Sequence, residues 1–220
     1  MAGLTSSTIG RKYAMALSAM FLLLFLIMHL SVNLLSICSP EAFNAASEFM
    51  GYNPVIQFLM QPVLGFAVVF HFVMGFVLEL KNRSARPVKY AVNKGSANST
   101  WMSRNMIISG LVVLAFLGLH LYDFWWHEIN FKYIEANTPD NGRFWEELHA
   151  NFANPLRVGF YVIAFVLLGL HLAHGFQSSF QSVGARHPKY TPVIKTLGTW
   201  YSILIPAGFI IIAVYHFLTQ

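Results

Sequence analysis

Residues 13–40 read YAMALSAMFLLLFLIMHLSVNLLSICSP and contain no Asp, Glu, Lys or Arg. This stretch exceeds the roughly 20 residues that an α-helix needs to cross the hydrocarbon core of a membrane. It is too long for the core of a signal peptide, and it shows no small-residue cleavage site. We therefore expect it to remain in the protein as a first transmembrane span.

Four more stretches lack charged side chains, at residues 49–78, 105–122, 158–185 and 196–220. The 220-residue chain is 56% hydrophobic and 10% charged, whereas soluble domains average roughly 45–50% and 25%. This composition excludes a soluble enzyme, and the continuous apolar runs exclude a β-barrel, whose strands alternate in polarity. We expect one all-α transmembrane domain over residues 1–220, with spans near 14–37, 57–80, 104–127, 156–180 and 197–218.

The basic residues are distributed unevenly between the two sides of these spans. Eleven of the fourteen Lys and Arg side chains lie on one side: before span one, in the segment between spans two and three, or in the segment between spans four and five. By the positive-inside rule, the N-terminus is predicted to be cytoplasmic and the C-terminus to lie outside. The positive net charge is therefore interpreted as a topology signal, not as a nucleic-acid site. Of the connecting segments, 81–103 is predicted to be a loop, and 128–155 to carry a short amphipathic helix through Phe144–Phe152.

Histidine side chains inside the spans are the strongest functional signal. His29, His71, His120 and His171 lie in four consecutive spans, with His174 beside His171. An ionisable group in hydrocarbon is costly, so it indicates a functional site by default. His127, His149, His187 and His216 fall at span ends or in loops, where we expect solvated histidines.

The depths of the histidines divide them into two levels. At about 1.5 Å per residue, His29 and His120 both lie about 25 Å from the cytoplasmic boundary. His71 lies about 12 Å and His171 about 10 Å from that boundary, if the hydrocarbon core is about 30 Å thick. We name His71 and His171 the inner pair, and His29 and His120 the outer pair. His174 lies one turn below His171 and suits the inner level equally well on depth alone.

Bundle topology pairs the histidines in the same way. In an up-down-up-down four-helix core, spans one and three lie diagonally opposite, as do spans two and four. Two facing imidazoles are typical axial ligands of a b-type haem, so the sequence predicts two haem groups, one above the other. The single Cys38 and the absence of a Cys-x-x-Cys-His motif exclude a covalently attached haem and an iron–sulfur cluster held by this chain.

Two glycines follow the inner pair at the same spacing. His71-x-x-x-Gly75-Phe76 recurs as His171-x-x-x-Gly175-Phe176, a repeat short enough to arise by chance. The missing side chains at Gly75 and Gly175 would give a porphyrin clearance, or would allow close helix packing.

Polar and aromatic residues gather near the outer level. They form either an interfacial aromatic belt or a quinone site, which needs an apolar slot with a few hydrogen-bonding groups. Those at the end of span three are Tyr122, Asp123, Trp125, Trp126 and His127, and Ser31 and Asn33 follow His29.

These residues resemble the cytochrome b membrane subunit of the dihaem succinate:quinone and quinol:fumarate oxidoreductases, the type with one five-helix anchor. The resemblance covers nearly the whole chain and rests on an ordered set of motifs. These are Arg11-Lys12, His29-Leu-Ser-Val-Asn33, Glu41-Ala-Phe-Asn-Ala-Ala, His120-Leu-Tyr-Asp123, Gly159-Phe-Tyr161 and His171-Leu-Ala-His-Gly175.

The resemblance implies that His71 and His171 hold the inner haem b and that His29 and His120 hold the outer one. It favours His171 over His174. It also implies menaquinone near the outer haem, in the cytoplasmic membrane of a bacterium. The implied partners are an FAD-containing flavoprotein with the dicarboxylate site and an iron–sulfur subunit, both on the cytoplasmic face. Some dihaem fumarate reductases have an acidic residue, proposed as a proton path, where this chain has Gly169, so that path is not supported here.

Two other function classes fit buried histidines. A transporter or channel with a histidine relay would not require the depths to match in pairs, and this chain lacks the intramembrane acids typical of such proteins. A haem-free anchor would use its histidines only for structure.

Overall fold

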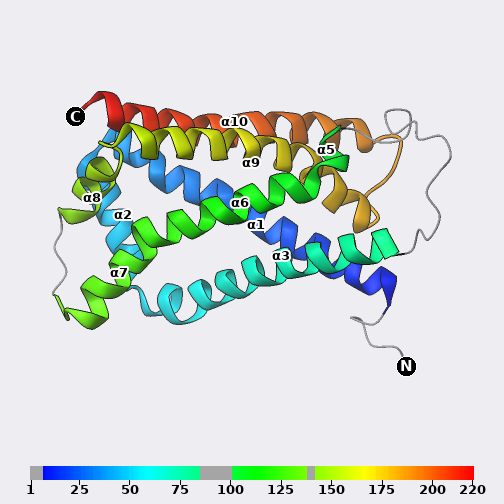
Figure 1. Cartoon of the computed structure of the whole chain (residues 1–220), viewed down its shortest axis with the longest axis horizontal. Helices are drawn as coiled ribbons and strands as arrows, with labels where there is room; N and C mark the ends of the chain where they lie inside the picture. Colours follow the sequence, from blue (N-terminus) through cyan, green and yellow to red (C-terminus); the bar gives the residue numbers. More distant parts are fainter. Residues whose placement is uncertain (1–6, 85–100, 138–141) are drawn as a thin grey trace.

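The computed structural model describes residues 7–84, 101–137 and 142–220, and their regular secondary structure is entirely helical. Five helices are long and apolar enough to cross a membrane, as the sequence predicts. They run side by side along the length of the molecule (Figure 1). Their bounds are α1 (Thr8–Cys38), η1 with α3 (Ile56–Ser84), α6 with its continuation (Met106–Ile134), α9 (Pro155–Ser182) and α10 (Thr191–Leu218).

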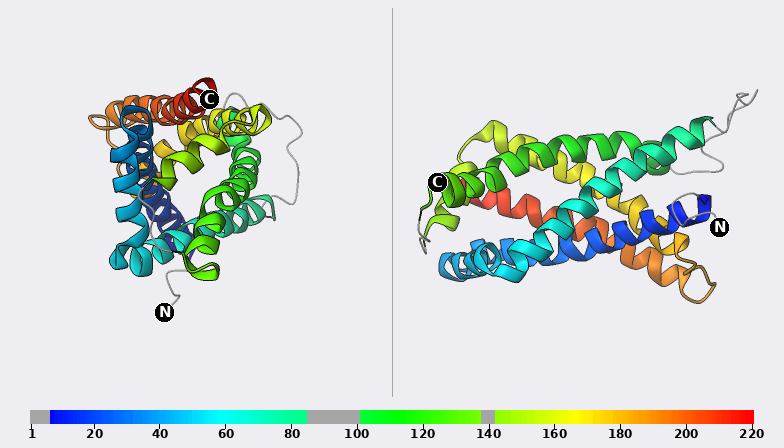
Figure 2. Two further views of the ribbon diagram at one scale, coloured as in Figure 1. Left: turned by 90° about the vertical axis from the view of Figure 1, so that its left-hand side faces the viewer. Right: turned by 90° about the horizontal axis from the view of Figure 1, so that it is seen from below.

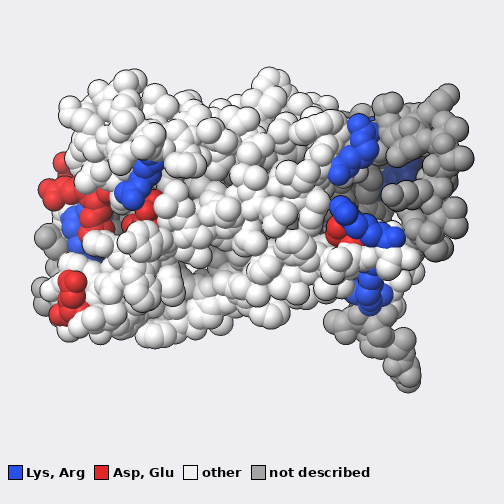
Figure 3. Space-filling model, in the orientation of Figure 1, with Lys and Arg blue, Asp and Glu red and all other residues white. Residues whose placement is uncertain are grey.

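Charged side chains gather at the two ends of the bundle and leave a broad uncharged band between them (Figure 3). Most acidic groups visible on this face lie at the end that holds the C-terminus, and Lys and Arg gather at the end that holds the N-terminus. This separation agrees with an odd number of crossings. The predicted cytoplasmic location of the N-terminus stays a prediction.

The helix boundaries follow from residues that satisfy the free backbone groups of a helix end. Ser39 ends α1 by donating its backbone N–H to the Leu35 carbonyl. Its hydroxyl also accepts the Ala42 N–H at 3.1 Å, which caps the next helix, α2 (Pro40–Tyr52). Asn154 caps α9 in the same way by accepting the Leu156 N–H at 2.9 Å, and Pro155 follows it at the first helical position.

The connecting segments differ in part from prediction. The short amphipathic helix is present as α8 (Arg143–Asn151), but α2 was not predicted. Span three passes from α6 into η2 (Leu121–Trp126) and continues beyond residue 127 through α7 (His127–Ile129) and η3 (Asn130–Ile134). Its last turns are held by the ion pair between Lys132 and Glu128, one turn apart. Most of the predicted loop 81–103 lies outside the described residues, although α5 (Trp101–Arg104) forms its last turn.

Helix packing places spans one and three, and spans two and four, on the two diagonals of the bundle. α1 packs against α3 and α9, and α9 packs against α6. Seen along the bundle, α1, α3, α6 and α9 surround its axis while α10 lies outside, against α1 and α9 (Figure 2). Gly208 permits this approach of α10, because a Cβ atom there would lie 2.8 Å from Leu30 Cδ1.

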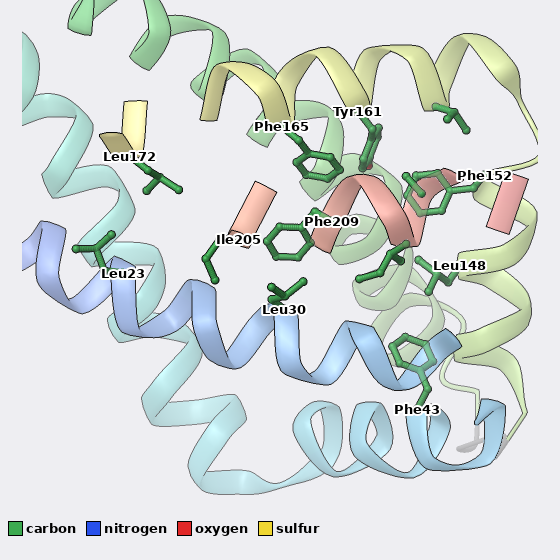
Figure 4. Packing of buried hydrophobic residues seen from close by; sticks show 13 residues of the cluster. Leu23, Leu30, Phe43, Leu148, Phe152, Tyr161, Phe165, Leu172, Ile205 and Phe209 are labelled. Atoms are coloured by element: carbon green, nitrogen blue, oxygen red, sulfur yellow. The ribbon is translucent and has the colours of Figure 1, made fainter. Parts of the chain in front are cut away.

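The buried core lies mainly between α1, α8, α9 and α10. Leu30 of α1 and Phe209 of α10 face one another within it, with Phe165 of α9 close by (Figure 4). The Phe165 and Phe209 rings stack with centroids 5.3 Å apart. In contrast, Ala67 is the one buried residue among those of α3. Exposed apolar side chains on α3 are expected where a helix faces lipid.

Candidate functional site

The four intramembrane histidines lie in two pairs that cross the diagonals of the bundle. The His29 ring of α1 lies 5.8 Å from the His120 ring at the end of α6, measured between centroids. The His71 ring of α3 lies 6.5 Å from the His171 ring of α9. These are the two pairs that depth and topology predict. The arrangement therefore brings together two imidazoles at each of two places, and their role as ligands stays a prediction.

Either His171 or His174 could be the partner of His71 in the inner pair on depth alone. The two side chains lie one turn apart on α9, and both are partly buried. It is the ring of His171 that lies across from His71. The side of span three also approaches this ring, since a Cβ atom at Gly110 would lie 3.5 Å from His171 Cε1. The geometry favours His171, in agreement with the resemblance.

Hydrogen bonds from the neighbouring span orient both rings of the inner pair. The Oγ atom of Ser18 on α1 lies 3.1 Å from His71 Nδ1. The Oγ atom of Ser109 on α6 lies 3.3 Å from His171 Nδ1. Each ring is thus held through Nδ1 and has Nε2 as its second nitrogen. These two serines were not predicted from the sequence.

The outer pair has a different environment, which is mainly aromatic. Phe25 stacks on His29 and Phe116 on His120, with centroid distances of 5.2 Å and 5.7 Å. The Asn33 amide group donates to the His29 carbonyl at 2.8 Å, and its nitrogen lies 3.4 Å from His29 Nδ1. His120 Nδ1 is buried and has no hydrogen-bond partner among the residues that the structure describes. The rings are therefore held mostly by packing.

The donor set fits haem iron. In residues 7–84, 101–137 and 142–220, no three His, Cys, Asp or Glu side chains gather as a bare metal ion would need. Pairs of imidazoles suit an iron whose remaining ligands come from a porphyrin. The serine contacts on the Nδ1 atoms of the inner pair also match a common feature of metal-bound histidine, whose second nitrogen is held by a hydrogen bond.

Gly75 and Gly175 lie against methionines of adjacent spans. A Cβ atom at Gly75 would lie 3.7 Å from Met15 Cε, and one at Gly175 would lie 3.6 Å from Met106 Cε. Both distances are ordinary van der Waals contacts. The two glycines therefore face neighbouring helices, which supports the interpretation that they allow close packing.

Four of the seven residues predicted to form the aromatic belt or quinone site line one pocket at the outer end of the bundle. Tyr122, Asp123, Trp126 and His127 border a pocket of about 410 Å³, together with Arg157. Trp125, Ser31 and Asn33 do not border it. The Ser31 hydroxyl is exposed and donates to the Ile27 carbonyl. The structure therefore separates a pocket group from Trp125 and from the pair on α1.

Asp123 is the most buried polar residue of this pocket group. Its side chain is 1% exposed, and its Oδ1 atom lies 3.4 Å from an Arg157 guanidinium nitrogen. Its Oδ2 atom accepts a 2.8 Å hydrogen bond from the hydroxyl of Tyr161 on α9. The Tyr161 ring lies 6.3 Å from the His120 ring. Tyr161 thus connects the pocket to the outer pair, although the sequence singled it out only as part of a motif.

One histidine prediction is wrong. His216, expected to be solvated at the end of span five, is fully buried. Its Nε2 atom lies 3.0 Å from Ser36 Oγ, and its Nδ1 atom lies 3.1 Å from His149 Nδ1. The reason is that α8 folds back over the outer end of α1 and α10, where Trp145 donates its indole N–H to the Ser36 carbonyl.

Over most of its length the chain is similar to a known cytochrome subunit. The chain matches no family model, and no solved structure matches it. It is similar to the succinate dehydrogenase cytochrome b558 subunit of Bacillus subtilis (strain 168), with 24% identity over 183 residues. The matched region covers 83% of this chain and 81% of that subunit.

Proposed function

We propose that this chain is the membrane-anchoring cytochrome b subunit of a bacterial complex II, the succinate dehydrogenase and fumarate reductase class. The similarity to a succinate dehydrogenase cytochrome b subunit over most of the chain supports the cytochrome b anchor family. Five membrane-spanning candidate helices support a multi-pass membrane protein, and the similarity to a subunit from Bacillus subtilis supports a bacterial one. The finer proposal is that the chain holds two haem b groups and connects an iron–sulfur subunit with menaquinone.

The observation that carries the proposal is the meeting of four histidines in two pairs. His71 and His171 would hold the inner haem, and His29 and His120 the outer one. A bound haem supplies one-electron chemistry, because its iron alternates between ferric and ferrous states. The chain contributes imidazole ligands, a dry apolar surrounding and, at the inner pair, hydroxyl groups that orient the rings.

The outer pocket is the proposed menaquinone site. Asp123, Arg157 and Tyr161 are linked there by an ion pair and a hydrogen bond, so the pocket offers groups that can orient a quinone carbonyl and hold a proton. Tyr122 and Trp126 border it with exposed aromatic side chains. Because Tyr161 also contacts His120, a quinone in this pocket would lie beside the outer pair.

The end of the bundle that holds the N-terminus is the proposed docking face for the partners. Basic residues gather there (Figure 3). The partners would be the iron–sulfur subunit and, with it, the FAD-containing flavoprotein. By the positive-inside rule this face is cytoplasmic, in the bacterial cytoplasmic membrane.

The haem content of the purified chain tests the proposal directly. We expect the dithionite-reduced spectrum of the membrane-extracted protein, or of its complex, to show b-type haem. A pyridine haemochrome assay against protein mass should then give two haem groups per polypeptide. One haem would contradict the two-site arrangement. No haem would overturn the proposal and would leave the haem-free anchor and the histidine-relay transporter as explanations of the buried histidines.

The two groups of quinone residues are separated by a second experiment. Asp123→Asn changes the buried carboxylate of the pocket, whereas Ser31→Ala changes the exposed hydroxyl on α1. We expect Asp123→Asn to slow haem reduction by a menaquinol analogue more strongly, with reduction by dithionite unaltered. A larger loss in Ser31→Ala would place the quinone beside α1 and contradict the pocket.

A further inference from the structure

We propose that Ser18 and Ser109 are positioning residues for the inner haem, each fixing the tautomer of one axial histidine and raising the basicity of its imidazole. This inference rests on the proposed function. It adds a distinction between the two haem sites, because the serine contact occurs at both inner ligands and at neither outer one.

The proton on each serine decides the direction of these hydrogen bonds. Ser18 Oγ lies 2.8 Å from the Met15 carbonyl, and Ser109 Oγ lies 3.0 Å from the Met106 carbonyl. A carbonyl only accepts, so each hydroxyl donates its one hydrogen to the backbone. The same oxygen can then only accept from the nearby imidazole. His71 and His171 must therefore carry a proton on Nδ1.

A neutral imidazole has one protonated and one unprotonated nitrogen. With the proton on Nδ1, the Nε2 atoms of His71 and His171 have free lone pairs, which is the form needed for coordination to iron. A hydrogen bond from Nδ1–H to an oxygen also makes the ring a better electron donor. Stronger donation stabilises ferric iron relative to ferrous iron, so the serine contacts should lower the potential of the inner haem.

The arrangement occurs twice, in helix pairs that occupy equivalent places in the bundle. The same residue types recur at an offset of 91 residues between spans one and three. Between spans two and four, they recur at an offset of 100 residues. In both pairs a serine meets the inner histidine and a methionine lies against the glycine that follows it. The corresponding residues are Met15, Ser18, Phe25 and His29 with Met106, Ser109, Phe116 and His120, and His71 and Gly75 with His171 and Gly175.

Serines in transmembrane helices commonly bond to the carbonyl three or four residues earlier, with no functional role. Two observations go beyond this. The same interhelical contact is built independently at both members of one ligand pair. At the outer pair, the polar atom beside His29 Nδ1 is an amide nitrogen, and His120 Nδ1 is without a hydrogen-bond partner among the described residues.

Redox titration of the intact complex, followed by optical and EPR spectra, tests the inference. We expect Ser18→Ala and Ser109→Ala each to retain two haem groups and to raise the midpoint potential of one of them. The double variant should show the larger shift, and the shifted haem should be the one that is lost in His71→Ala. The potential of the other haem should not change.

Two further variants separate positioning from packing. Ser18→Thr and Ser109→Thr keep the hydroxyl and should return the potential toward that of the original protein. Ser179→Ala is the matched control, because Ser179 is a buried serine of α9 whose hydroxyl donates to the Phe176 carbonyl at 2.8 Å. It should leave both potentials unchanged.

Failure of this inference can be distinguished from failure of the proposed function. If the original protein binds two haem groups and the alanine variants match Ser179→Ala in both potentials, the inference is overturned while the proposed function stands. An equal shift of both haem groups would also overturn it, because the contacts are confined to the inner pair. An original protein without haem would overturn the proposed function and this inference together.

Discussion

The inner and outer histidine pairs share one arrangement of helices but are held by different interactions. At the inner pair, a serine on the adjacent span contacts each Nδ1 atom. At the outer pair, phenylalanines stack on both imidazoles, and Tyr161 reaches the edge of His120. Directional bonds set the protonation pattern of a ring, whereas aromatic packing mainly sets its position.

This difference matches the surroundings of the two pairs. The inner pair lies toward the basic end, where the proposed iron–sulfur partner docks. The outer pair lies toward the pocket bordered by Asp123 and Arg157. A carrier beside a protein partner needs only an electron path, whereas one beside a quinone also needs groups that hold protons. The outer end of the chain supplies such groups, in the linked side chains of Asp123 and Tyr161.

The largest expected effect comes from removing ligands. His71→Ala or His171→Ala should abolish the inner haem and preserve most of the outer one, and His29→Ala or His120→Ala should do the reverse. Haem stoichiometry and EPR spectra of the purified complex would show which signal disappears. His174→Ala is the matched control and should retain both haem groups. Loss of the same signal in His71→Ala and His29→Ala would contradict the pairing.

A smaller effect should follow from crowding one ligand of the inner pair. A Cβ atom at Gly110 would be in ordinary contact with His171, so Gly110→Ala should be tolerated. The longer side chain in Gly110→Leu would press on the ring, and overpacking of this kind costs about 1–3 kcal/mol. We expect lower occupancy of the inner haem only, measured by haem content and redox titration.

Gly118 gives the matched control for this prediction. It lies on the same helix, and a Cβ atom there would have no heavy atom within 4 Å. Gly118→Leu should therefore leave both haem groups in place. Equal losses of haem in the two leucine variants would show that the effect comes from the helix and not from contact with His171.

The sequence predicted the pairing well because depth depends only on counting residues along straight helices. Matching depths for His29 and His120 and for His71 and His171 were enough to define two pairs. The serine partners depend on how each helix is rotated about its axis, which is determined by packing across the whole bundle. The 91-residue recurrence of a serine eleven residues before a histidine was nevertheless a usable signal, at Ser18 and Ser109.

The predictions that differ from the structure concern the outer end of the bundle, where the chain leaves the regular spans. α2 was not predicted, because it is a short, moderately polar helix that begins at Pro40, directly after α1. His216 was predicted to be solvated because it lies near the end of span five. Its burial depends on α8, which covers that end and places His149 against it. Such contacts join residues far apart in the chain, so local composition does not reveal them.

An intermediate effect is expected from the link between the pocket and the outer pair. Tyr161→Phe removes the hydrogen bond to the buried carboxylate of Asp123, and an unsatisfied buried group of this kind costs about 1–3 kcal/mol. The free energy of unfolding should fall by about this amount. The potential of the outer haem should change while that of the inner haem does not. Denaturant unfolding and redox titration would measure the two effects.

Tyr201→Phe is the control for the loss of a tyrosine hydroxyl. Tyr201 donates to the neutral Leu23 carbonyl at 2.6 Å, on the side of α10 that faces α1. Hydrogen bonds to charged groups are the stronger kind, so this variant should lose less stability than Tyr161→Phe. It should also leave the outer haem unchanged. The opposite order of stabilities would mean that Asp123 does not depend on Tyr161.

The smallest expected effect lies outside both pairs, at the start of α2, and gives the baseline for the comparison. The Ser39 hydroxyl donates to Glu41 at 2.7 Å and thereby lowers the pKa of that carboxyl group. A carboxyl pKa that is lower in the folded state adds stability above its unfolded value, and this stability is lost as the pH falls through the folded value. The thermal midpoint should therefore decrease slightly more on acidification in the original protein than in Glu41→Gln. Both haem spectra should be identical in the two proteins, because the Glu41 carboxylate is exposed at the surface. A change in either haem spectrum would indicate that the outer end is coupled to the haem groups through α2.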